Sequence, residues 1–198
     1  MSANVIETPA PPVTQNPPRK RWTRSECLVL ESTGLIDQQR LELIEGELID
    51  KMGKKRPHVD AHALLFAWLI QAFGARFVNS EAPIDVAPED NPTNEPQPDL
   101  FVLRTEGSPT TPQAKDLRLV VEISDTTLAF DMTTKAALYA RASIVEYWVL
   151  DIQGRRLIVH RDPQNGQYRS VTAYSETESI APLAAPGSPF RVGDIFPQ

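Results

Sequence analysis

The stretch LRLVVEIS, residues 117–124, is a run of apolar side chains with one carboxylate inside it. Apolar side chains on both faces are typical of a strand in the middle of a sheet that is covered on both sides. A carboxylate in such a strand needs compensation, because an unpaired buried charge costs several kcal/mol. The stretch therefore predicts a central buried strand and marks Glu122 as a side chain that needs a cation or a metal ion.

A second apolar run, residues 100–103, lies upstream and follows Pro98-Asp99 directly. If the two runs pair as an antiparallel hairpin folded between residues 110 and 111, Asp99 lies opposite Glu122, with Cβ atoms about 5 Å apart. The long loop between them does not fix this register, so the pairing is a hypothesis. Two carboxylates that close repel unless a cation lies between them, and oxygen ligands of this kind suit Mg²⁺ or Mn²⁺.

A helix is predicted over residues 131–142, with Asp131 as its N-cap and Lys135 in its first turn. The link over residues 124–130 is short enough to bring Lys135 back over Glu122. An ammonium group there could hold an attacking water or stabilise charge that develops on a phosphate. The alternative is a salt bridge within the helix, since Asp131 and Lys135 are spaced i, i+4, and spacing alone favours this alternative.

The rest of the chain predicts a mixed α/β domain with a central sheet flanked by helices and extra C-terminal strands. The other expected elements are a short helix ending at Ser32 and capped by Thr23 or Ser25, a hairpin over 41–49, a helix over 58–73, and strands over 76–87, 146–151, 156–160 and 168–174. In the helix over 58–73, the side chains at helical spacing are expected to face the core; they are Leu64, Leu65, Trp68, Leu69 and Ala72.

Composition sets the class of protein. Residues 1–21 are rich in proline and polar side chains and read as a disordered tail, so the folded domain is expected over 22–198. The chain has a single cysteine, Cys27, and no apolar stretch of membrane-spanning or signal-peptide type, which predicts a cytoplasmic protein. A net charge of -6 argues against a general nucleic-acid coat protein. It leaves room for an enzyme whose carboxylates hold metal ions.

The order Pro98-Asp99, Glu122-Ile123-Ser124 and Lys135 resembles the PD-(D/E)xK nuclease signature, with Ser124 at the usual lysine position and the lysine moved to the next helix. More closely, the chain resembles the Uma-type restriction endonucleases of bacteria. The matching segments are ELIEGELIDKM (42–52), Pro57-His58, EPQPDLFVLR (95–104), LVVEISDTTLAFDMTTKAALYA (119–140) and VEYWVLD (145–151).

This resemblance implies a restriction-endonuclease-like fold, a divalent metal ion and hydrolysis of phosphodiester bonds in DNA. Carried over by position, Asp99 and Glu122 are metal ligands, Lys135 is the catalytic lysine and Glu42 completes the site, with Glu47 as a competitor for that last role. A cut through both strands by one small domain would favour a symmetric homodimer, for which the C-terminal strands could form the interface.

Several features of the sequence allow two interpretations. His58 could contact a phosphate or move a proton, or it could be a polar residue at a helix end. Lys54, Lys55 and Arg56 form either a rim that faces phosphate or a solvated loop. Ser124 departs from the signature. A binding module on a nuclease scaffold and a metal-dependent hydrolase of another substrate are therefore the alternatives to a DNA endonuclease.

Overall fold

The computed structural model describes residues 19–37, 40–51, 53–106 and 110–196. Most of the predicted tail over 1–21 lies outside these residues. At the start of the described chain, the backbone N–H of Trp22 donates to the carbonyl oxygen of Gly46 at 2.8 Å. The first described residues therefore lie against the hairpin that was predicted over 41–49.

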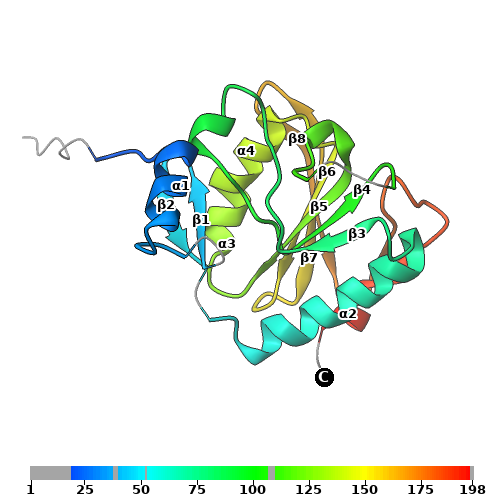
Figure 1. Cartoon of the computed structure of the whole chain (residues 1–198). Helices are drawn as coiled ribbons and strands as arrows, with labels where there is room; N and C mark the ends of the chain where they lie inside the picture. Colours follow the sequence, from blue (N-terminus) through cyan, green and yellow to red (C-terminus); the bar gives the residue numbers. More distant parts are fainter. Residues whose placement is uncertain (1–18, 38–39, 52, 107–109, 197–198) are drawn as a thin grey trace, which may run out of the picture.

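A six-stranded mixed sheet forms the centre of the molecule, with strand order β3-β4-β5-β6-β7-β8. Strands β5 and β6 are parallel, and the other neighbouring pairs are antiparallel. The strands are β3 (Val78–Ser80), β4 (Leu100–Leu103), β5 (Leu117–Ser124), β6 (Glu146–Asp151), β7 (Arg156–Gln164) and β8 (Gln167–Ser175). The predicted mixed α/β class with a central sheet is confirmed (Figure 1).

Over residues 100–102 the register between β4 and β5 is the predicted one, because Leu100 pairs with Val121 and Phe101 pairs with Val120. Extending this register by one residue sets Asp99 against Glu122. The register shifts at Leu103, which pairs with Leu117. The predicted strand over 76–87 was too long, since only Val78–Ser80 forms a strand and Asp85 makes an isolated bridge to Gln113. Pro83 cannot donate to a ladder, and the following residues cross the core as irregular chain with Ile84 fully buried.

One face of the sheet is covered by α2 (Arg56–Phe73), which runs along it as the long cyan helix in Figure 1. Its buried side is a stripe at spacing i, i+4 formed by Ala61, Leu65 and Leu69. The prediction that Leu64 faces the core was wrong: it is 43% exposed. Its position is one residue off this stripe, where the helix surface turns toward solvent.

The other face is covered by one continuous helical segment made of α3 (Leu128–Phe130), a π-helical turn η3 (Asp131–Lys135) and α4 (Ala136–Arg141). The prediction that Asp131 is the N-cap was wrong, because the helix begins at Leu128 after Thr127. Instead, the Asp131 carboxylate accepts hydrogen bonds from the hydroxyl groups of Ser124 and Thr127, both at 2.6 Å.

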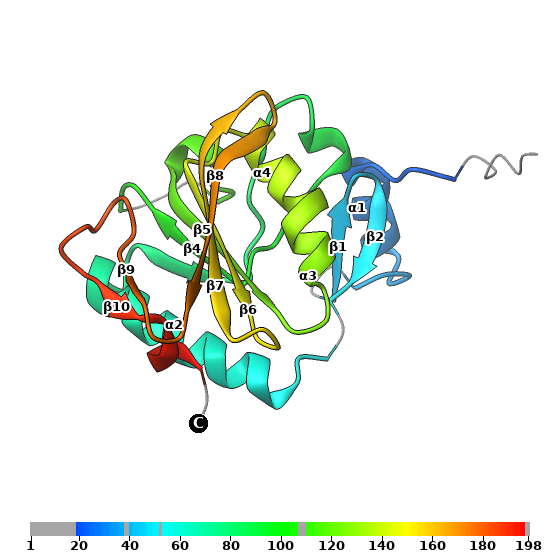
Figure 2. The same ribbon diagram turned by 180° about the vertical axis from the view of Figure 1, so that it is seen from behind.

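A small lobe lies beside α3 and α4 in both views (Figures 1 and 2) and contains α1 (Arg24–Ser32) and the hairpin of β1 (Leu41–Ile44) with β2 (Glu47–Asp50). Thr23 and Glu26 form a capping box on α1. The hairpin turns at Glu45-Gly46, where both residues have positive φ values of 49° and 74°. A backbone bond from Glu95 to Leu43 ties the hairpin to the body of the protein.

The C-terminal segment returns to the sheet beside α2 (Figure 2). In this segment, the centroid of the Phe190 ring lies 4.3 Å from the ring centroid of Trp68 and 5.9 Å from that of Trp148. The remaining short elements are η1 (Asn91–Thr93), η2 (Ala114–Asp116), β9 (Ser179–Ile180), β10 (Phe190–Arg191) and η4 (Val192–Ile195). Within the described residues, no helix combines the length and apolar character that crossing a membrane requires.

Candidate active site

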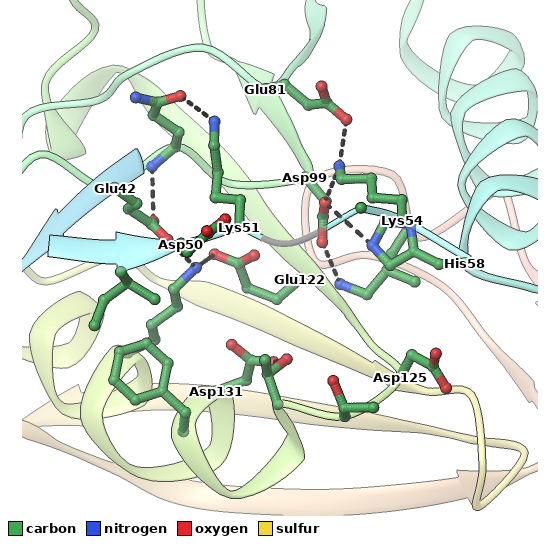
Figure 3. A pocket seen from close by; sticks show the side chains of 18 of the residues that line it. Glu42, Asp50, Lys51, Lys54, His58, Glu81, Asp99, Glu122, Asp125 and Asp131 are labelled. Carbon is green, nitrogen blue, oxygen red and sulfur yellow. Dashed lines mark hydrogen bonds and ion pairs between the residues drawn. The ribbon is translucent and has the colours of Figure 1, made fainter. Parts of the chain in front are cut away.

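A cavity of about 670 Å³ opens where the hairpin lobe meets the sheet and the two helical layers. Four of the predicted site residues line it, together with His58. Figure 3 labels Glu42, Asp99, Glu122 and His58 among the side chains around it. Glu42 comes from β1, Asp99 from the residue before β4, Glu122 from β5 and Lys135 from the π-helical turn. The structure thus brings together side chains that lie up to 93 positions apart, from Glu42 to Lys135.

Lys135 lies between two buried carboxylates. Its Nζ is 3.0 Å from Oε2 of Glu42 and 3.0 Å from Oε1 of Glu122. All three side chains are at most 7% exposed. The ion pair with Asp131 that spacing alone favoured is not among the ion pairs of the described residues. The π-helical turn between the two residues changes the α-helical spacing on which that expectation depended.

Tyr139 adds a second donor to the same carboxylate. Its hydroxyl group lies 2.8 Å from Oε1 of Glu122, and the Tyr139 side chain is fully buried. Lys135 and Tyr139 therefore both donate to Oε1, and neither uses Oε2. Tyr139 was not among the candidate site residues predicted from the sequence. The signal for its role was the i, i+4 spacing from Lys135, which puts both side chains on one face of a helix.

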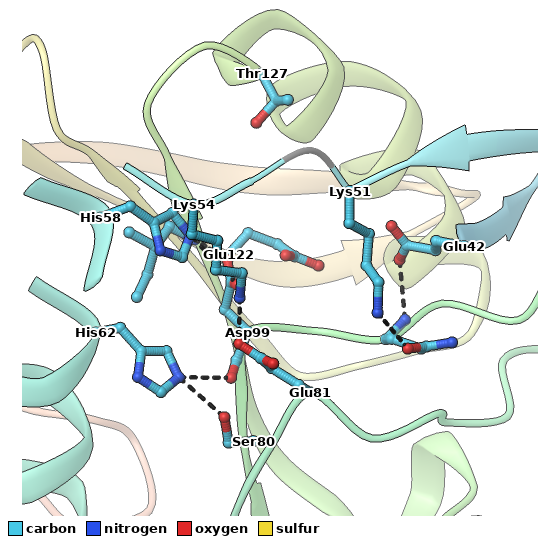
Figure 4. Close-up of polar contacts among 12 residues, drawn as sticks. Glu42, Lys51, Lys54, His58, His62, Ser80, Glu81, Asp99, Glu122 and Thr127 are labelled. Carbon is cyan, nitrogen blue, oxygen red and sulfur yellow. Dashed lines mark hydrogen bonds and ion pairs between the residues drawn. The ribbon is translucent and has the colours of Figure 1, made fainter. Parts of the chain in front are cut away.

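Asp99 is held by three donors. Its Oδ2 accepts the backbone N–H of Ile123 at 2.7 Å, and its Oδ1 accepts from Nζ of Lys54 at 2.7 Å. Nε2 of His58, in the first turn of α2, lies 3.4 Å from the same Oδ1. His62 supports the backbone here, since its Nε2 contacts the carbonyl oxygen of Asp99 and the hydroxyl of Ser80 (Figure 4).

Two of the accessory candidates lie away from the cavity surface. Ser124 is buried and its hydroxyl donates to Asp131, so it stabilises the π-helical turn and does not line the cavity. Glu47 lies at the turn end of the hairpin, where its half-exposed side chain is 3.7 Å from Arg19. Ile49 and Asp50, at the other end of β2, line the cavity instead. The structure therefore places Glu42, rather than Glu47, at this site.

The burial of these charges shifts their proton affinities. Burial and the neighbouring carboxylates Asp99 and Glu42 raise the pKa of Glu122 to about 8, although Lys135 acts in the opposite direction. Asp99 is also buried, but the hydrogen bond from His58 and the charge of Lys54 hold its pKa well below the usual range. Burial opposes the charge on Lys135 as well. Even so, Glu122 and Glu42 raise the pKa of its ammonium group above the ordinary value.

Carboxylate oxygens are the donors that Mg²⁺ and Mn²⁺ take in proteins, and Asp99, Glu122 and Glu42 present them in one cavity. Within the described ranges, no group of three or more Asp, Glu, His or Cys side chains is arranged to hold a metal ion. The ammonium groups of Lys54 and Lys135 contact these carboxylates instead. The donor chemistry fits a hard divalent cation, and the lysines mark where its charge would be compensated.

The mixed sheet and this cluster of carboxylates with a buried lysine define a nuclease-like protein of the restriction-endonuclease class. The family model of Uma2, described as "Putative restriction endonuclease", matches residues 26–192, and the chain belongs to this family.

Among solved structures, the chain is similar to the crystal structure of "a putative nuclease belonging to DUF820" from Anabaena variabilis. The TM-score is 0.68 at 16% sequence identity, and the match covers 88% of this chain and 97% of that chain. At this identity the likeness supports the fold alone. None of the curated proteins compared with the chain matches it.

Proposed function

We propose that the protein is a divalent-metal-dependent endonuclease that hydrolyses phosphodiester bonds in DNA. The observation that carries this proposal is the position of Lys135, whose Nζ lies 3.0 Å from both Glu42 and Glu122 in the cavity that also holds Asp99. A buried lysine among carboxylates joins the two groups that this reaction needs, because the anions can hold a metal ion and the cation can stabilise charge on phosphate.

Each residue then has a distinct task. Asp99 and Glu122 would hold Mg²⁺ or Mn²⁺, with Glu42 beside them. A bound divalent cation would act as a Lewis acid and lower the pKa of a bound water. Lys135 stays protonated, so it can orient the attacking water or donate to a phosphate oxygen. Tyr139 fixes Glu122 through Oε1, which keeps that carboxylate in one rotamer while its Oε2 takes part in neither bond.

The distribution of charge around the cavity supports a polyanionic substrate. Its carboxylates come from several elements, whereas four of its five Lys and Arg side chains come from the segment over 40–55 that contains the β1–β2 hairpin; they are Arg40, Lys51, Lys54 and Lys55, and the fifth is Lys135. Basic side chains gathered on one wall can contact the phosphate backbone even though the whole chain carries a charge of -6. Nucleic acid is therefore the substrate class that this cavity favours, with DNA as the proposed member.

Cleavage of plasmid and duplex oligonucleotides tests this proposal, with Mg²⁺ or Mn²⁺ present and with EDTA as the negative condition. We expect Glu122→Gln to reduce cleavage by about 10²-fold or more. Glu31→Gln, the same chemical change at an exposed position on α1, should leave it unchanged. A wild-type protein that cuts no DNA with either metal, or an E122Q variant that cuts normally, would contradict the proposal.

The same samples separate the alternative functions. A binding module would retain DNA in a gel-shift experiment but would neither cut it nor give a calorimetric signal with Mn²⁺. A metal-dependent hydrolase of another substrate would bind Mn²⁺ without binding or cutting nucleic acid, whereas an RNA-directed enzyme would cut single-stranded or duplex RNA and spare DNA.

We also propose that the active protein is a symmetric homodimer that forms through the outer edge of β8. Within the described residues this nine-residue strand ends the sheet, carries one charged side chain, Arg169, and leaves Val171 50% exposed. A long edge with little charge readily pairs with another strand. Antiparallel pairing of two copies about Val171 sets Tyr168 against Tyr174 and keeps the two Arg169 side chains from directly opposing each other. Light scattering after size exclusion would contradict this if the protein is monomeric at micromolar concentration.

A further inference from the structure

We infer that Lys54 is an exchangeable internal counterion: it holds Asp99 while no metal is bound, and it must leave this carboxylate when a divalent cation binds. The inference rests on the proposed function, since it concerns the same metal site. It gives Lys54 a role that differs from a passive place in a basic rim, and it separates the two lysines of the cavity into one fixed and one movable cation.

The contacts of Lys54 place it at the proposed metal position. Its Nζ lies 2.7 Å from Oδ1 of Asp99 and also pairs closely with Glu81. Lys54, Asp99 and Glu81 point toward one another in Figure 4. The Lys54 side chain is 28% exposed and that of Asp99 is 12% exposed. The ion pair is therefore shielded enough from solvent to affect the affinity of the site for a metal ion, and the ammonium group still has access to solvent.

The other two partners of Asp99 are fixed by the fold. The backbone N–H of Ile123 belongs to the central strand β5, and His58 belongs to the first turn of α2. Lys54 lies outside any helix or strand, just before α2. It also reaches Asp99 through a flexible four-carbon chain. Of the three partners, Lys54 is therefore the one that can withdraw while the surrounding structure stays in place.

Glu81 offers Lys54 a second position. Its backbone has a φ of 53°, in the left-handed region that non-glycine residues seldom adopt. Its N–H donates to the carbonyl oxygen of Pro98 at 3.1 Å, which ties it to the residue before Asp99. The Glu81 carboxylate is 49% exposed, at the outer side of Lys54. After leaving Asp99, the ammonium group can stay on Glu81, where it is available to a substrate phosphate at the cavity mouth.

Lys135 provides the contrast. Its side chain is 7% exposed, and it lies on a helical turn between Glu42 and Glu122. Withdrawing it would leave two buried carboxylates without their shared cation. Lys135 thus keeps its carboxylate partners when a metal ion binds, whereas Lys54 gives up Asp99 to the metal.

Calorimetric titration of the full-length, metal-free protein with Mn²⁺ tests the inference. Removing a charge-assisted hydrogen bond that competes with the metal should tighten Mn²⁺ binding by about tenfold in Lys54→Met. Lys51→Met is the matched control, because Lys51 lines the same cavity but donates to Gln97. It should change the affinity by about twofold or less, through its long-range charge alone. Lys54→Gln, which keeps a donor but no charge, should lie between wild type and K54M. It also serves if K54M does not fold.

Cleavage provides a second readout with the opposite sign. K54M should bind Mn²⁺ more tightly and yet cut DNA about tenfold more slowly, because the freed ammonium group no longer meets the phosphate.

Equal Mn²⁺ affinity in wild type and K54M, or an equal gain in K51M, would overturn the inference while wild-type cleavage and its loss in E122Q still supported the proposed function. If neither the wild type nor K54M binds Mn²⁺, the proposed function fails as well.

Discussion

Lys135→Met isolates the contribution of the buried cation. Methionine keeps the length and apolar character of the lysine side chain but removes the ammonium group that lies 3.0 Å from both Glu42 and Glu122. Two carboxylates at most 5% exposed would then face each other with no shared counterion. Breaking a buried ion pair by removing one partner costs about 3–5 kcal/mol. We expect the free energy of unfolding to fall by about this amount near pH 8.

The loss should depend on pH in a defined direction. Burial already raises the pKa of Glu122 to about 8, and Lys135 is the group that lowers it, so the variant should have a still higher value. A carboxyl group with a raised pKa in the folded state binds its proton more tightly there than in the unfolded chain. It therefore adds stability that is complete below its unfolded pKa of about 4.3 and is lost as pH rises through the folded pKa. The K135M variant should accordingly recover stability as the pH is lowered from about 8 to about 5.5.

Urea unfolding followed by the fluorescence of the buried Trp148 measures this effect. Lys115→Met, at an exposed position in η2, is the control and should shift the free energy of unfolding by less than about 0.5 kcal/mol. Addition of Mg²⁺ should restore part of the stability of K135M, since a cation that binds only the folded state stabilises it. A loss below about 1 kcal/mol at pH 8, or an equal loss at both pH values, would refute the reasoning about an uncompensated pair.

Two further predictions concern Glu122. Tyr139→Phe removes the hydroxyl group that lies 2.8 Å from Oε1 of Glu122. It should reduce the free energy of unfolding by about 1–2 kcal/mol and weaken Mn²⁺ binding in calorimetry, whereas Tyr174→Phe on β8 should do neither. Because the pKa of Glu122 is raised to about 8, Mg²⁺ affinity should increase with pH up to that value, with proton release that buffers of different ionisation enthalpy reveal. A pH-independent affinity in the wild type, or an unchanged slope in E122Q, would count against this assignment.

The central strands of the sheet could be predicted from the sequence, because each of them is a continuous apolar run. The runs over 100–103 and 117–124 are apolar on both faces, which marks them as strands of a covered sheet but does not by itself choose their register. The hypothesis of a hairpin folded between residues 110 and 111 supplied the register with Leu100 opposite Val121, and with it the approach of Asp99 to Glu122. The helix over 56–73 was found from the helical spacing of its apolar side chains, although the exposed Leu64 shows that periodicity fixes a helix better than the limits of its buried face.

Contacts between charged side chains from distant segments were harder to predict. Lys54 belongs to a loop with no periodicity, so nothing in the sequence pairs it with Asp99, 45 positions away. Glu42 and Glu47 differ only in their position along one hairpin, and the choice between them depends on which end of that hairpin meets the sheet. The resemblance to Uma-type proteins supplied Glu42 where physical reasoning about the hairpin left both residues open.

The departure at Ser124 and the position of Lys135 have a common physical basis. The Ser124 hydroxyl donates to the carboxylate of Asp131 at 2.6 Å, and Asp131 is the first residue of the π-helical turn that ends at Lys135. Ser124 directly follows the Glu122-Ile123 pair on β5, so this bond ties the strand that carries the carboxylate to the turn that carries the lysine. A lysine at position 124 would occupy the buried space where this bond is made. The serine thus helps to hold in place a lysine that reaches Glu122 from the helix, which makes the altered signature compatible with an intact site.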